Sequence, residues 1–155
     1  MKPRIATLLA GVLFSLALFG VAAAGPLEDG RAAYERSDYA TALRLLRPLA
    51  EQGSAEAQLR LGWMSQFGQS GTVDEKQAVA WYGKAADQGL PEAQYNLGFM
   101  LEGGYGVTKD EAQARKLYRK AADQGHAMSQ VIVATFYAIG EDGTRDDLRA
   151  NTNSG

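Results

Sequence analysis

The sequence predicts an all-α protein, a right-handed α-solenoid of stacked antiparallel helix pairs, on two observations. The first is a repeat with a period of 36 residues, marked by Gly53, Gly89 and Gly125, each of which follows an Ala-Asp-Gln or Ala-Glu-Gln motif. The second is apolar spacing of three and four residues, as in Ala57 and Leu61, which is typical of amphipathic helices rather than strands. A fixed period of roughly 20 to 50 residues built from helices indicates units that bury their apolar faces against one another.

The composition excludes several kinds of chemistry. The chain has 155 residues and a mass of 16.6 kDa, enough for one domain. It contains no cysteine and a single histidine. A disulfide framework, a thiolate metal site, a cysteine nucleophile and a zinc site built on several histidines are therefore excluded. We expect no cofactor and no metal.

The N-terminus has the pattern of a secretory signal peptide. Lys2 and Arg4 precede an apolar run over 5–21, and three alanines at 22–24 supply the small residues of a cleavage site. We expect cleavage after Ala24 and a periplasmic or secreted protein; the alternative is an uncleaved membrane anchor. Removing 1–24 changes the formal net charge from −2 to −4. We therefore expect no binding to nucleic acid and no stable membrane association after cleavage.

The helices follow from the apolar pattern and its stop signals. Gly89 and Gly125 stand where a helix closes through a left-handed residue, and Pro91 suits a first turn. Two capping boxes start the later helices, Thr72 with Glu75 and its equivalent 36 residues on, although the aspartates two residues after each threonine could cap instead. The expected helices cover 27–36, 38–52, 55–67, 75–88, 91–102, 111–124 and 127–139.

Small residues within the apolar stripes indicate close helix packing. Removing bulk at these positions lets two short helices approach, while large side chains fill the remaining space. The small residues are Ala57, Gly62, Ala78 and Ala85, and the large ones are Met64, Trp81 and Tyr82.

The repeated motifs resemble a known family. Ala-Gln-x-x-Leu-Gly-x-Met, then Gly-x-Gly-Val, then Tyr-x-Lys-Ala-Ala-Asp-Gln-Gly resembles the Sel-1-like repeat, a relative of the tetratricopeptide repeats. Residues 91–125 match almost throughout, and 54–89 match with a divergent loop at 69–73. Residues 27–53 resemble a tetratricopeptide-type opening unit.

The resemblance and the period divide the chain into a signal peptide, a repeat domain and a tail. The repeat domain covers 25–143, with units at about 27–53, 54–89 and 90–125 and a partial unit at 126–143. Residues 144–155 are expected to form a flexible or weakly helical tail. The last unit lacks its second helix, so 127–139 either packs as a lone capping helix or leaves an apolar face open. We expect a monomer, with a dimer through the C-terminal end as the alternative.

Four candidate chemical sites have simpler structural explanations. His126 is expected in a loop, and the glycines at 103, 104 and 106 lack the Gly-Lys-Ser/Thr that a phosphate loop requires. The Asp-Glu pairs at 74–75 and 110–111 stand at helix starts, where negative charge is favourable. The basic residues between 115 and 120 have acidic neighbours and predict a solvated face.

One set of residues suggests a binding surface. By resemblance to tetratricopeptide units, a second face of each first helix would point into a concave groove, with aromatic anchors and polar groups for a peptide backbone or carboxylate. The alternative is that Trp63 and Phe99 pack between repeats. The candidates are Leu59, Arg60, Trp63, Gln66, Tyr95, Asn96, Phe99 and Glu102, and the same face of the last helix carries Val131, Thr135 and Ala138.

The function expected is that of an exported, non-enzymatic scaffold that binds a protein or peptide partner in this groove. One alternative is implied by the resemblance: some secreted Sel-1-like proteins bind or hydrolyse β-lactams. Those proteins are rich in cysteine, and no serine after residue 24 begins a Ser-x-x-Lys motif here. A second alternative is a structural subunit of an envelope assembly.

Overall fold

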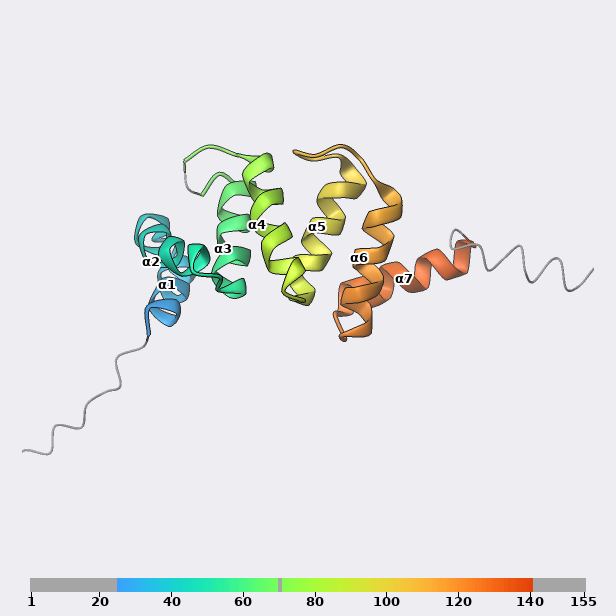
Figure 1. Ribbon diagram of the computed structural model, residues 1–155, viewed down its shortest axis with the longest axis horizontal. Helices are drawn as coiled ribbons and strands as arrows, with labels where there is room; N and C mark the ends of the chain where they lie inside the picture. The colour runs from blue at the N-terminus through green and yellow to red at the C-terminus, as the bar shows by residue number, and fades with distance from the viewer. Residues whose placement is uncertain (1–24, 70, 141–155) are drawn as a thin grey trace, which may run out of the picture.

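The computed structural model describes residues 25–69 and 71–140, and over these residues it forms seven helices and no strand (Figure 1). The expected all-α fold and the expected helices are confirmed, with ends that differ by at most one residue. The predicted signal peptide and tail lie outside the described residues. The helices are α1 (Pro26–Glu35), α2 (Tyr39–Glu51), α3 (Ala55–Gln66), α4 (Glu75–Asp87), α5 (Pro91–Gly103), α6 (Glu111–Asp123) and α7 (Ala127–Ile139).

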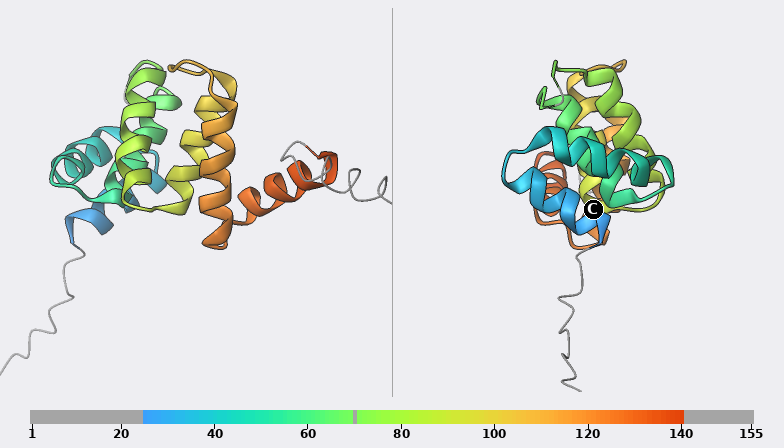
Figure 2. Two further views of the ribbon diagram at one scale, coloured as in Figure 1. Left: turned by 45° about the vertical axis from the view of Figure 1, so that its right-hand side comes forward. Right: turned by 90° about the vertical axis from the view of Figure 1, so that its left-hand side faces the viewer.

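The helices stack in chain order. Each helix packs mainly on the helix before it and the helix after it, so most contacts join consecutive helices from α1 to α7. Figures 1 and 2 show α1 and α2 at one end of the molecule and α7 at the other. This arrangement is that of a solenoid, in which each unit is stabilised by its neighbours.

Aspartates, not threonines, begin the second helices of the two complete units. Asp74 Oδ1 accepts a hydrogen bond from Gln77 N at 2.9 Å, and Asp110 Oδ1 accepts one from Gln113 N at 2.9 Å. The capping boxes on the threonines are therefore not formed, and the alternative that the sequence left open is correct. At the other end, the residue after the C-cap of α4, Gly89, has φ +88°, the left-handed conformation that glycine adopts without strain.

A glycine facing a tyrosine sets the spacing of each complete helix pair. Tyr82 of α4 and Tyr118 of α6 are almost wholly buried. A Cβ at Gly98 would lie 2.9 Å from Tyr118 Cε1, and a Cβ at Gly62 would overlap the Tyr82 ring more severely. The expectation that small residues allow close approach is confirmed, because the ring of one helix occupies the place of a side chain on the other.

The last helix is only partly covered. Ile132, Val133 and Phe136 pack against the core around Tyr118, and Ser129 is the only buried residue of α7. The opposite side exposes apolar side chains, among them Met128 at 55% and Val131 at 61%. Figure 2 (left) shows α7 leaving the stack at an angle to α6. Within the described residues, α7 is thus a lone terminal helix that also leaves an apolar face open.

Candidate binding face

The first cluster of candidate residues surrounds the guanidinium of Arg60. Its Cζ lies 5.4 Å from the ring centroid of Tyr34 on α1 and 5.1 Å from that of Trp63 on α3. Glu56 holds the group in place, because its Oε1 accepts from Arg60 Nε at 3.0 Å and from Nη2 at 2.9 Å. Stacking on two rings and pairing with one carboxylate fix the orientation of this cation.

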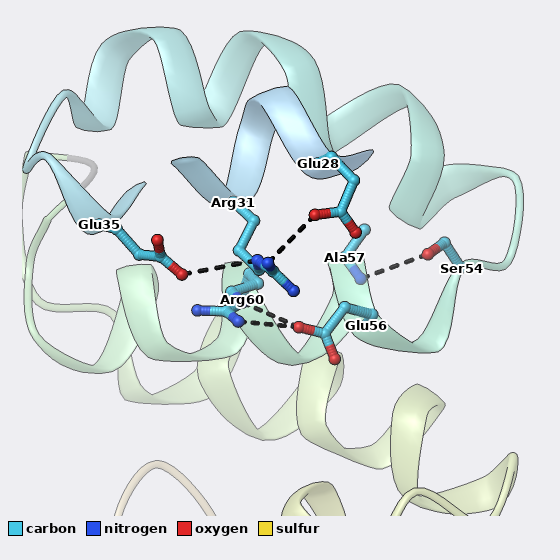
Figure 3. A network of polar contacts seen from close by, with 7 residues as sticks. All are labelled: Glu28, Arg31, Glu35, Ser54, Glu56, Ala57 and Arg60. Atoms are coloured by element: carbon cyan, nitrogen blue, oxygen red, sulfur yellow. Dashed lines mark hydrogen bonds and ion pairs between the residues drawn. The ribbon is translucent and has the colours of Figure 1, made fainter. Parts of the chain in front are cut away.

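Figure 3 shows that a second arginine lies near this cluster with carboxylates of its own. Arg31 of α1 pairs with Glu28 at 3.2 Å and with Glu35 at 3.5 Å. Both ion pairs are about half exposed, so they contribute little to stability. Two carboxylates against one guanidinium leave this part of α1 with a net negative charge.

The second cluster is an exposed aromatic pair. Phe99 of α5 is 41% exposed and stacks on Tyr105, which follows α5 and is 43% exposed, with ring centroids 5.4 Å apart. Gly103 makes this possible, since a Cβ there would overlap the Tyr105 ring. Phe99 therefore does not pack between repeats, whereas Trp63 is half-buried and contacts the core.

Tyr95 and Asn96 lie between these clusters in the sequence but have different surroundings. The Tyr95 ring is half-buried, 5.9 Å from that of Tyr118 and 4.9 Å from that of His126. Asn96 Nδ2 is buried and has no hydrogen-bond partner among the described residues. A buried amide donor without a partner is costly to the folded state.

Three candidates serve the fold instead. Leu59 is 3% exposed and belongs to the core, so its expected role in the groove is wrong; the apolar stripe of α3 is wider than the sequence suggested. Gln66 Oε1 accepts from the Tyr82 hydroxyl at 2.6 Å, and Glu102 Oε2 accepts from the Tyr118 hydroxyl at 2.8 Å. Burial raises the pKa of both tyrosine hydroxyls, and at Tyr118 the Glu102 carboxylate raises the pKa further.

His126 is the N-cap of α7, with two partners that the sequence did not suggest. Its Nδ1 accepts from Ser129 N at 3.3 Å and lies 2.9 Å from Ser129 Oγ, while Nε2 lies 3.1 Å from Glu92 Oε2. A carboxylate, an imidazole and a hydroxyl in sequence resemble a hydrolase triad. Ser129 is fully buried, however, so its hydroxyl cannot reach a substrate. The group instead joins α5 to α7.

Charge is divided between the two sets of helices. Among the first helices, α1 carries three acidic and one basic side chain, α3 one of each, and α5 two acidic and none basic. Among the second helices, α2 carries one acidic and two basic side chains, α4 two of each, and α6 two acidic and four basic. The excess of acidic side chains therefore lies on the first helices, α1 and α5.

We call this surface the first-helix face and define it by the residues of the two aromatic clusters and Asn96. Two of these were missed in the sequence, Tyr34 and Tyr105, because each contacts a partner in another element. The Gly-Gly-Tyr-Gly run could have indicated Tyr105, since glycine leaves room for a ring. The face comprises Tyr34, Arg60, Trp63, Asn96, Phe99 and Tyr105.

The family is shown by a match over more than half of the chain. The Sel1 repeat model matches residues 15–54, 55–90 and 91–126. The chain belongs to the Sel1 repeat family. Its first unit, which resembled a tetratricopeptide opening unit, is matched as a Sel1 repeat as well. Sel1 repeat proteins are generally non-enzymatic scaffolds for protein interactions.

Solved structures agree with this assignment. A Sel1 repeat protein from Oxalobacter formigenes is 36% identical, with a TM-score of 0.70 over 74% of this chain and 46% of that one. A protective antigen of uropathogenic Escherichia coli strains is 32% identical, with a TM-score of 0.68 over 74% and 26%. Cysteine rich protein B of Helicobacter pylori, at 21% identity and TM-score 0.56 over 68% and 96%, shares the fold. This chain spans less than half of the first two, and no curated protein matches it.

Two further observations concern the described residues alone. No helix within 25–69 and 71–140 is long and apolar enough to cross a bilayer. Over the same ranges, no three acidic or histidine side chains gather closely enough to hold a metal ion.

Proposed function

We propose that this Sel1 repeat protein is an exported, non-enzymatic scaffold that binds a peptide segment of a protein partner on the first-helix face. The observation that carries the proposal is the pair of aromatic clusters, around Arg60 and around Phe99, in which Trp63 and Phe99 occupy equivalent positions of consecutive units. Aromatic side chains are common anchors of protein interfaces. Stacked repeat units present equivalent side chains at a regular spacing.

The charge of the face supports a basic partner. Glu56 pairs with Arg60 in the first cluster, Glu28 and Glu35 share Arg31 on α1, and Glu102 lies one turn from Phe99. Acidic groups at the rim of an interface attract positive charge and increase the association rate. Exposed rings add favourable contacts for lysine and arginine. Since the face is short, we expect a modest affinity that falls with increasing salt.

The two tryptophans allow a direct test. In a Trp81→Phe background, Trp63 is the only source of indole fluorescence. Short peptides of Lys, Arg and Leu should change its emission saturably, and the same peptides with Glu in place of the cations should not. Trp63→Ala should weaken binding about tenfold or more, measured with a labelled peptide.

A matched control separates binding from folding. Trp81→Ala removes the same kind of side chain from α4, a second helix, and should leave peptide affinity unchanged. Far-UV circular dichroism and thermal unfolding report whether each variant folds. The proposal is wrong if Trp63→Ala and Phe99→Ala retain wild-type affinity while folded, or if basic and acidic peptides bind equally.

Export and lack of catalysis have tests of their own. N-terminal sequencing of the exported protein should begin at Gly25, and a start at Met1 would contradict cleavage. Nitrocefin should not be hydrolysed, and turnover would support the β-lactamase alternative instead.

A further inference from the structure

A cavity of about 550 Å³ lies between α4, α5 and α6. This volume is within the range of small-molecule sites. None of the residues of the first-helix face lines it. The cavity is lined by Asp87, Leu97, Asp110, Ala112, Gln113, Lys116, Leu117, Arg119 and Lys120.

The cavity lies where the two complete units differ in side-chain size. Leu117 of α6 is equivalent, 36 residues on, to Trp81 of α4. The Trp81 indole packs against the core cluster that contains Leu61, which is 2% exposed, and Lys84 Nζ lies 4.4 Å above the ring. In the next unit, Leu97, the equivalent of Leu61, is only partly buried. A leucine in place of an indole leaves room beside α5 for a planar ring.

The rim of the cavity carries two cations that the preceding unit lacks. Arg119 is equivalent to Gly83 and Lys116 to Ala80, and both add positive charge to that of Lys120. The Arg119 guanidinium lies 5.9 Å from the Tyr137 ring centroid, and its buried Nε has no hydrogen-bond partner among the described residues. The terminal nitrogens of the guanidinium form a planar fork of donors that pairs with a carboxylate.

Two aspartates also line the cavity and reduce its positive charge. Asp110 is the N-cap of α6, where its Oδ1 accepts a hydrogen bond from Gln113 N. Three cations against two carboxylates leave the lining net positive. The apolar surface comes from Leu97, Leu117 and Ala112.

We propose that this cavity binds a small aromatic carboxylate, with its ring between Leu97 and Leu117 and its carboxylate on Arg119. The ring takes the place that the Trp81 indole occupies in the preceding unit. The carboxylate pairs with the Arg119 guanidinium and is attracted by the neighbouring lysines. An uncharged aromatic compound lacks the contact between the carboxylate and Arg119. An aromatic amine is repelled by Arg119 and the neighbouring lysines.

Three probes and two variants test the proposal. Indole-3-acetate should bind wild type saturably in a calorimetric titration, indole about tenfold more weakly, and tryptamine more weakly still. Arg119→Gly, which restores the residue of the preceding unit, should reduce indole-3-acetate affinity about tenfold and leave indole affinity unchanged. Leu117→Trp should abolish binding of both by filling the cavity.

The location is tested by amide chemical shifts on the titrated wild-type protein. Changes centred on Leu97, Leu117 and Arg119 support the proposal, and changes centred on Trp63 or Phe99 overturn it. Equal affinity for the three probes, or no saturation with indole-3-acetate, would also overturn it. If Leu117→Trp fails to fold, Arg119→Gly alone decides, because it lies at the rim and removes no core side chain.

Discussion

The two complete units, α3 with α4 and α5 with α6, are alike in their interiors and different on their surfaces. In both units a glycine of the first helix packs against a buried tyrosine of the second helix, and an aspartate is the N-cap of the second helix. The differences are at positions that do not set the helix spacing, where Trp63 corresponds to Phe99, and Trp81 to Leu117. The shared residues therefore specify the solenoid, and the residues that differ provide its two candidate binding surfaces.

The largest expected effect comes from the glycine and tyrosine contacts. Gly62→Ala should lower the free energy of unfolding by about 1–3 kcal/mol, because the new methyl overlaps the buried Tyr82 ring. Gly98→Ala should cost less, since its Cβ would lie 2.9 Å from Tyr118 Cε1, a less severe overlap. Urea unfolding measures both.

Gly83→Ala is the matched control for these two substitutions. Gly83 lies inside α4, and a Cβ there would meet nothing within 4 Å. The change should therefore stabilise the protein by about 0.5–1 kcal/mol through helix propensity. If Gly62→Ala behaves like Gly83→Ala, the close approach does not set the spacing.

A smaller effect is expected from the glutamine at the fourth position of each unit's first helix. Gln58 Nε2 donates to Ala50 O at 2.9 Å, whereas Gln94 Nε2 donates to Ala86 O at 3.5 Å. Gln58→Ala should therefore cost about 1–2 kcal/mol and Gln94→Ala less, measured by thermal unfolding. The exposed Gln130 is the control and should cost least. Equal losses at the first two positions would contradict the comparison.

The smallest expected effect is on the pH dependence of stability, to which both buried tyrosines contribute. Folding raises the pKa of Tyr82 and Tyr118 above the unfolded value of about 10, so both contribute stability below that pH. This stability is lost as the pH rises above about 10, because the unfolded chain then loses its protons first. The free energy of unfolding should fall less steeply with pH in Tyr118→Phe than in wild type.

Tyr105→Phe is the control for this pH dependence, because Tyr105 is exposed. It should leave the alkaline decrease of stability as it is in wild type. An alkaline profile that no buried tyrosine substitution changes would contradict the assignment.

The sequence predicted the period, the helices and the small residues because each depends on neighbours at a fixed distance along the chain. The prediction that Leu59 lies in the groove was wrong, because the burial of this residue depends on how much of α3 the adjacent helices cover. Tyr34 was missed because its contact with Arg60 joins two units. The choice between threonine and aspartate as N-cap depends on the loop backbone, which no local pattern specifies.

The glutamine contacts have a consequence for how such a chain can grow. Gln94 reaches back eight residues to Ala86 and receives a hydrogen bond from Gln124, thirty residues later. Both separations are shorter than one period. A tandem duplication of residues 90–125 would therefore supply every new copy with its own donors and acceptors. Recombination could lengthen the solenoid by whole repeat units, which would add binding surface without changing the contacts between existing units.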